Sequence, residues 1–315
     1  MKCFRCGSSA VSLSAPCTRC GFDILSSDVI SSLFEIDTDY VNEDLLSQYN
    51  YPVIIKGVKH WSDAKSLNAE GILDISILSH FMELEELKLS NSKLSDLNQI
   101  PQLKRLRKLD LSYNYIANLE PLRTCDNLEE LSLGENFVCQ LEPISRLERL
   151  ERLVLGNNRI KNVSRLSGLK NLASLALDGN HIADAQALSD LFNLKKLDLS
   201  YNQITDIAPL AKMDKLKELI LDRNAVSRLK PLTGLKSLER LRLAYNKIKD
   251  LEPLKTLANL KVLDLSWNQI SDATPLNNLA NLERLDLTGN FLSERQMMSV
   301  KKALPRAEID NKSVK

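Results

Sequence analysis

The stretch LKKLDLSYN, residues 194–202, follows the pattern L-x-x-L-x-L-x-x-N, which recurs through most of the chain. Ten copies follow one another from Leu84 to the copy that begins at Leu282, at a constant period of 22 residues. Only the first copy departs from the pattern at the asparagine, where Ser92 stands. Ten copies in register do not arise by chance, and they predict a solenoid in which each repeat packs against its neighbours.

Each repeat can be interpreted position by position, and we number the positions 1 to 22 from the first leucine. Positions 4 and 6, such as Leu197 and Leu199, lie on one face of a short strand and are expected to point into the core. The asparagine at position 9, such as Asn202, is expected to bond backbone groups where the chain turns, so that stacked copies form an amide ladder. Proline suits the first turn of a short helix. It recurs at position 16, as Pro121, Pro143, Pro209, Pro231, Pro253 and Pro275.

This pattern resembles the leucine-rich repeats of the 22-residue class, which includes bacterial internalins and the leucine-rich regulatory subunit of type-one protein phosphatase. The resemblance covers roughly residues 62–310. It implies an α/β solenoid shaped as a horseshoe, with a parallel sheet on the concave side and short 3-10 or helical turns on the convex side. It also implies a binding scaffold, although fold alone does not fix function.

The ends of the repeat array are expected to be capped. At the C-terminus, Ser293 is a good N-cap for a helix that ends near Leu304, and the sequence AEID then supplies a last edge strand. The segment YPVIIKGV is either a strand or an extended connector. The expected divisions are a zinc ribbon at 1–22, a helical linker or N-terminal cap at 23–61, repeats at 62–292 that begin with a half repeat lacking the leucine strand at 62–83, and a C-terminal cap at 293–315.

Two Cys-x-x-Cys pairs stand at the start of the chain, Cys3 with Cys6 and Cys17 with Cys20, and a glycine follows each pair. Four thiolates at this spacing predict a closed tetrahedral zinc site, which is structural because no coordination position is left for a substrate water. A segment this short cannot bury a core, so the metal supplies its folding energy. Iron in a rubredoxin-like site and a disulfide framework are the alternatives.

The exposed positions of the repeats carry the candidate partner-binding residues. Of the eight aromatic residues after Leu84, seven lie at position 8 or 10, which suggests anchors for a partner on the concave face and its rim. The alternative is that each ring only covers the neighbouring turn. The candidate binding set is Tyr113, Val154, Tyr201, Ile220, Arg223, Arg242, Tyr245, Asp264 and Trp267. Position 8 alone predicts a continuous line of Tyr201, Arg223, Tyr245 and Trp267 over four repeats.

Composition and motifs narrow the function classes. The net charge is +1, which argues against nucleic acid as the main partner. The chain contains no run of eighteen apolar residues, no signal-peptide pattern and no catalytic motif such as H-E-x-x-H or G-x-S-x-G. We therefore expect a cytoplasmic, non-enzymatic scaffold that binds a protein on its concave face. The alternatives are a nucleic-acid-associated adaptor that uses the zinc ribbon, with Lys2, Arg5 and Arg19, and a phosphatase-regulator-like subunit.

Overall fold

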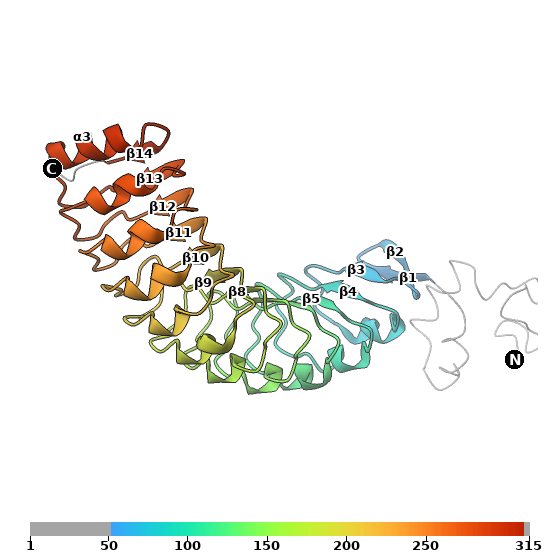
Figure 1. Ribbon diagram of the computed structural model, residues 1–315. Coiled ribbons are helices and arrows are strands. Elements are labelled where there is room, and N and C mark those ends of the chain that lie inside the picture. The colour runs from blue at the N-terminus through green and yellow to red at the C-terminus, as the bar shows by residue number, and fades with distance from the viewer. Residues whose placement is uncertain (1–51, 312–315) are drawn as a thin grey trace, which may run out of the picture.

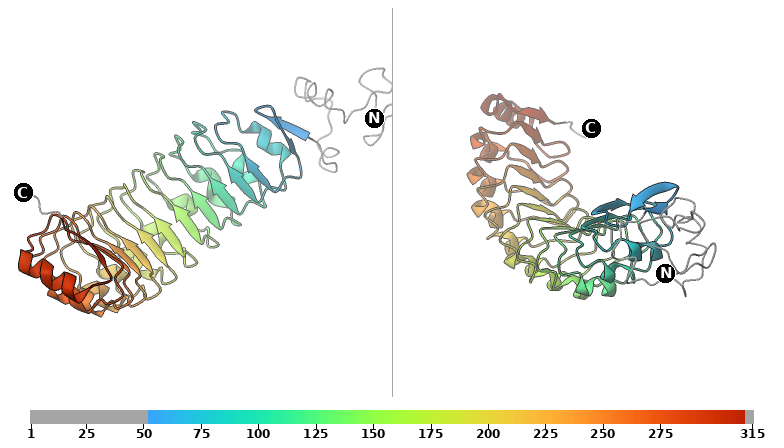
Figure 2. Two further views of the ribbon diagram at one scale, coloured as in Figure 1. Left: turned by 90° about the horizontal axis from the view of Figure 1, so that it is seen from above. Right: turned by 90° about the vertical axis from the view of Figure 1, so that its right-hand side faces the viewer.

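A parallel sheet lines the inner side of a curved solenoid in the computed structural model, which describes residues 52–311 (Figure 1). The sheet has twelve strands in the order β14 to β3, and every neighbouring pair is parallel. The strands are β3 (Ser66–Asn68), β4 (Glu86–Lys88), β5 (Lys108–Asp110), β6 (Glu130–Ser132), β7 (Arg152–Val154), β8 (Ser174–Ala176), β9 (Lys196–Asp198), β10 (Glu218–Ile220), β11 (Arg240–Arg242), β12 (Val262–Asp264), β13 (Arg284–Asp286) and β14 (Glu308–Asp310). Figure 2 shows these strands side by side along the length of the molecule.

The outer side of the curve is formed by short 3-10 helices, one for each repeat (Figure 1). They are η2 (Ser76–His80), η3 (Ile100–Gln102), η4 (Glu120–Thr124), η5 (Glu142–Ile144), η6 (Ser164–Leu166), η7 (Gln186–Asp190), η8 (Ala208–Leu210), η9 (Lys230–Gly234), η10 (Glu252–Thr256) and η11 (Thr274–Asn278). All six prolines at position 16 lie in the first residues of such a helix, as predicted. A strand and a 3-10 helix repeat every 22 residues, and the helix side is the wider one, so the stack curves toward the strands.

The core is one continuous leucine-rich cluster between the sheet and the 3-10 helices. Leu197 and Leu199, at positions 4 and 6, are buried, and the equivalent leucines of the other repeats are buried as well. Asp198 lies between them on the same strand and faces the concave surface, where it remains partly exposed. The prediction of an inward leucine pair and an outward position 5 is confirmed.

Buried asparagines at position 9 join each repeat to the one before it. The Nδ2 group of Asn202 donates to the carbonyls of Leu177, Leu199 and Ser200 at 2.9, 3.1 and 3.0 Å. Its Oδ1 accepts from the backbone N–H of Ile182 at 2.9 Å. The same contacts recur at Asn114, Asn136, Asn158, Asn180, Asn224, Asn246, Asn268 and Asn290. The predicted amide ladder is therefore present.

The N-terminal end of the array differs from the expectation in one respect. Residues 62–83 were expected to lack a strand, and this was wrong, because β3 (Ser66–Asn68) pairs with β4 and buries Leu67. The spacing from β3 to β4 is 20 residues and not 22, so the leucine fell outside the expected register. Before it, β1 (Pro52–Ile55) and β2 (Val58–Trp61) form an antiparallel hairpin, in agreement with the strand alternative for YPVIIKGV. The predicted zinc ribbon and the helices expected after it lie outside the described residues.

The C-terminal cap has the predicted form. Helix α3 (Glu294–Ala303) begins after Ser293, whose Oγ accepts a hydrogen bond from the backbone N–H of Gln296 at 3.3 Å. Met297 and Val300 turn the apolar side of the helix toward the last repeat. Strand β14 then adds a final parallel edge to the sheet beside β13. Together these elements cover the core that the last repeat would otherwise expose.

Replacing Asn202 with alanine should destabilise the fold by about 3 kcal/mol, because it leaves the buried N–H of Ile182 and two buried carbonyls without their partner. The matched control is Asn193→Ala, which removes an exposed amide that contacts the Lys170 carbonyl. Urea unfolding followed by circular dichroism measures both. Equal losses for the two variants would contradict the role of the buried ladder.

Candidate protein interface

Position 8 of the repeats has an unusual backbone, which places its side chain at the edge of the sheet. In every repeat this residue has a positive φ, for example 53° at Tyr201, 54° at Arg223 and 57° at Trp267. Its N–H still donates to the next repeat, as Tyr201 N does to the Asp222 carbonyl at 2.8 Å. The chain thus leaves the sheet through a left-handed turn immediately before the buried asparagine.

The predicted line of position-8 side chains forms a continuous stack, which we call the C-terminal stack: Tyr201, Arg223, Tyr245 and Trp267. The guanidinium carbon of Arg223 lies 5.2 Å from the ring centroid of Tyr201 and 4.1 Å from that of Tyr245. The rings of Tyr245 and Trp267 are stacked with centroids 5.3 Å apart and an angle of 8° between their planes. Neighbouring strands are about 4.8 Å apart, so each repeat presents its side chain at the stacking distance of the next.

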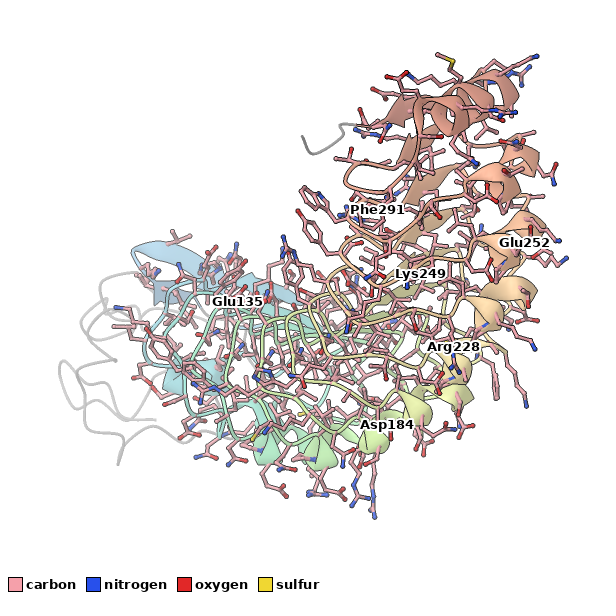
Figure 3. All side chains as sticks on the ribbon, turned by 90° about the vertical axis from the view of Figure 1, so that its left-hand side faces the viewer. Glu135, Asp184, Arg228, Lys249, Glu252 and Phe291 are labelled. Carbon is pink, nitrogen blue, oxygen red and sulfur yellow. The ribbon has the colours of Figure 1, made fainter. Side chains whose placement is uncertain are left out.

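A shorter stack occupies position 10 in the N-terminal half. The rings of Tyr115 and Phe137 are parallel within 7° at a centroid distance of 6.0 Å, and the guanidinium of Arg159 lies 4.4 Å from the Phe137 ring. Figure 3 shows Phe291, also at position 10, and Glu135, at position 8, on the inner side of the curve, whereas Asp184, Arg228 and Glu252 lie on the outer side. Positions 8 and 10 therefore border the concave face.

The choice of residue at position 8 is informative because a positive φ is unfavourable for most side chains. Asparagine and glycine tolerate it best, and they occupy position 8 at Asn91, Asn157, Gly179 and Gly289. An aromatic residue or arginine there costs about 1 kcal/mol of backbone strain. The C-terminal stack places four such residues in succession. Local packing accounts for a part of this, since the Trp267 ring covers Gly289, but Tyr245 and Trp267 are still 40% and 41% exposed.

Beside the stack, the strands carry a charged cluster on the concave face. Nη2 of Arg242 lies 2.7 Å from Oδ2 of Asp222 and 3.8 Å from Oδ2 of Asp264. The Asp222 side chain is only 8% exposed, and its Oδ1 accepts from the backbone N–H of Ala244 at 2.8 Å. Burial raises the pKa of Asp222, while the Ala244 N–H and the Arg242 guanidinium act in the opposite direction. Arg242 thus compensates a carboxylate that the fold has largely removed from water.

The remaining candidate residues are less closely connected. Val154 and Ile220 are half-buried on β7 and β10, and Tyr113 is exposed at position 8 four repeats before Tyr201. Their role in binding stays a prediction. The sequence interpretation missed Asp222, the partner of Arg242, although an aspartate at position 7 followed 20 residues later by an arginine at position 5 was a usable signal.

The described part of the chain has no constellation that resembles an enzyme or metal centre. Between residues 52 and 311, no three histidine, cysteine, aspartate or glutamate side chains are grouped closely enough to hold a metal ion. Cys125 is buried, and this burial raises the pKa of its thiol to about 11, so the thiol stays protonated at neutral pH. No helix among these residues is long and apolar enough to cross a bilayer.

Comparison with known proteins agrees with this architecture. A family model described as Leucine Rich repeats (2 copies) matches residues 104–146, 148–190, 192–236, 214–256, 236–278 and 258–294, more than half of the chain. The chain belongs to the leucine-rich-repeat family. No curated protein shows significant sequence similarity to it.

Among solved structures, the leucine-rich-repeat chain is similar to an internalin of Listeria monocytogenes, InlF, with 27% identity and a TM-score of 0.71. That match covers 90% of this chain and 88% of the internalin. Internalin C2 of the same organism is 34% identical over 59% of this chain and 82% of its own, with a TM-score of 0.57. The plant peptide hormone receptor RGFR1, solved in complex with RGF2, is 23% identical with a TM-score of 0.63, over 80% of this chain and 48% of the receptor. At that identity the receptor shows a shared fold only.

The backbone cost at position 8 can be measured at Tyr113, whose φ is 57°. Tyr113→Gly should be more stable than Tyr113→Ala by about 1 kcal/mol, because glycine adopts a positive φ without a steric penalty and alanine does not. Thermal unfolding of the two variants tests this as a difference in Tm. If the two variants unfold at the same temperature, position 8 carries no strain and the residues found there need no functional reason.

Proposed function

We propose that this protein is a non-enzymatic scaffold that binds a protein partner on the C-terminal half of its concave face. The observation that supports the proposal best is the C-terminal stack, in which exposed aromatic and arginine side chains occupy four successive left-handed positions. Tyrosine, tryptophan and arginine are the residues that most often dominate protein interfaces. A preformed stack also loses little side-chain entropy when a partner binds.

The fold supports the same proposal. A curved array with a parallel inner sheet offers a long, rigid surface whose outward positions are free of any role in the core. Leucine-rich-repeat proteins are typically interaction scaffolds, and the RGFR1 complex with RGF2 is one instance among the similar structures. The partner would extend along the strand-bearing side, with the C-terminal stack at one border and the Arg242 cluster beneath it.

The double variant Tyr245→Ala/Trp267→Ala should weaken partner binding by more than 2 kcal/mol, about 30-fold in Kd, if these rings are the anchors. The partner would be isolated from nuclease-treated lysate by affinity capture, and its Kd would then be measured by calorimetry. Tyr113→Ala is the matched control, since it removes an exposed ring at the same repeat position outside the C-terminal stack. Unchanged affinity in the double variant would show that the rings serve local packing alone.

We further propose that Cys3, Cys6, Cys17 and Cys20 hold one structural zinc ion in a small N-terminal ribbon. These residues lie outside the described part of the chain, so the support is the chemistry and spacing of the donors. Two Cys-x-x-Cys pairs supply four soft thiolates from two tight turns, which matches closed tetrahedral zinc sites. Such a ribbon would serve as an accessory docking module beside the repeat array.

Elemental analysis of the purified chain should find about one zinc per molecule, and Cys6→Ser should lose it, since three thiolates bind zinc much more weakly than four. The repeat array should keep its own unfolding transition in this variant, because its core is built without the ribbon. Cys139→Ser, an exposed isolated cysteine, is the control. Iron in place of zinc, or a disulfide-bonded metal-free protein, would contradict the proposal.

A further inference from the structure

The Arg242 cluster shows how the concave face holds a guanidinium group. Arg242, at position 5 of its repeat, donates through Nε to Oδ2 of Asp222 at 2.7 Å, and Asp222 stands at position 7 of the preceding repeat. The arginine also approaches Asp264 at position 5 of the following repeat. Because all repeats have the same geometry, an aspartate at position 7 and the residue 20 positions later at position 5 are neighbours throughout the array.

Two repeats earlier, the same pair of positions holds two carboxylates. Asp178 occupies position 7 and Asp198 occupies position 5 of the next repeat, so an aspartate stands where Arg242 stands in the other pair. No lysine or arginine within residues 52–311 makes an ion pair with either of them. The lysine on the same strand, Lys196, is engaged by Glu218 at 3.4 Å.

The two carboxylates respond to each other. Asp178 does not point toward the following repeat as Asp222 does; its carboxyl lies over Gly156 of the preceding repeat, where a Cβ would come within 2.4 Å of Oδ1. Burial, and then the negative charge of Asp198, raise the pKa of Asp178, and no cation counteracts them. Asp198 is held by the backbone N–H and the hydroxyl of Ser200 at 2.9 and 2.6 Å. The fold therefore maintains a half-buried pair of like charges.

The surface next to this pair has room for a long side chain. Ala176 lies beside Asp198 on the neighbouring strand, and Val154 follows on the strand before it. Positions 7 of the two preceding repeats are glycines, Gly134 and Gly156. Short side chains on this side and the rings of the C-terminal stack on the other leave the carboxylates accessible from the concave face.

We propose that the concave face binds a protein segment carrying an arginine, whose guanidinium group lies above Ala176 and contacts both Asp178 and Asp198. Residues that flank the arginine in this segment pack on the C-terminal stack. The inference rests on the proposed scaffold function and adds the chemistry of its partner. Charge complementarity selects this occupant, because two unpaired carboxylates attract a guanidinium and repel the phosphates of a nucleic acid.

The internal arrangement supplies the first test. Asp198→Arg places an arginine relative to Asp178 as Arg242 stands relative to Asp222, so it should raise the Tm of the protein. The matched control is Asp110→Arg, since Asp110 bonds Ser112 as Asp198 bonds Ser200, but position 7 before it is Ser90 and not an aspartate. The control should lower Tm. A fall in Tm for both variants would mean that the pair cannot accept a guanidinium, and would overturn the inference.

The second test uses a displayed library of random twelve-residue peptides, selected against the full chain. Arginine should be enriched at one position, and exchanging it for alanine in a selected peptide should weaken binding at least 10-fold. Asp178→Asn/Asp198→Asn should abolish the enrichment, whereas Asp286→Asn, at the same position 5 near the C-terminal end, should retain it.

The outcomes of the selection separate the inference from the function on which it rests. Selected peptides that require Tyr245 and Trp267 but show no enrichment of arginine would overturn the arginine site and leave the scaffold intact. Enrichment of lysine in place of arginine would overturn the guanidinium assignment. A selection in which no peptide depends on either set of residues would overturn both proposals.

Discussion

Every other feature of this molecule depends on the hydrogen bonds of the buried asparagine side chains. A strand of three residues followed by a turn into the core would leave backbone groups without partners, and each such group costs about 1–3 kcal/mol when buried. One asparagine amide satisfies the carbonyls of two successive repeats and an N–H of the earlier one. The turn and the repeat-to-repeat contact are thus a single interaction. Because it is made at the same place in nine repeats, the array is regular over its whole length.

The same turn creates the proposed interface. To bring the asparagine inward, the residue before it takes a left-handed backbone, and its side chain then projects at the edge of the concave sheet. Strand spacing and aromatic stacking distance are nearly equal, so aromatic residues in successive repeats, such as Tyr245 and Trp267, form a stack without any adjustment of the backbone. A structural requirement of the repeat therefore becomes a row of mutually supported side chains, which needs only suitable residues to bind a partner.

The sequence predicts much of this because the period links local pattern to position in space. The frame starts, the inward leucines, the asparagine ladder, the prolines of the 3-10 helices and the Ser293 cap all follow from residues read at a 22-residue spacing. Strand β3 escaped because its Leu67 stands 20 residues before the next strand leucine. The sign of φ at position 8 and the pairing of Asp222 with Arg242 also escaped, since both depend on how neighbouring repeats are stacked. Residues 1–51 are too short in repeated pattern for the same reasoning to apply.

Regularity also turns differences between repeats into evidence. In an irregular protein, a half-buried aspartate without a cation has no reference against which its environment can be judged. Here the pair Asp222 and Arg242 shows what the same two positions look like when their charges are balanced, and the pair Asp178 and Asp198 departs from it in one side chain. The geometry is constant, so the difference lies in chemistry alone. A fold selected only for stability would have no use for like charges at neighbouring positions in the middle of its inner face, and a partner that supplies the opposite charge gives them one.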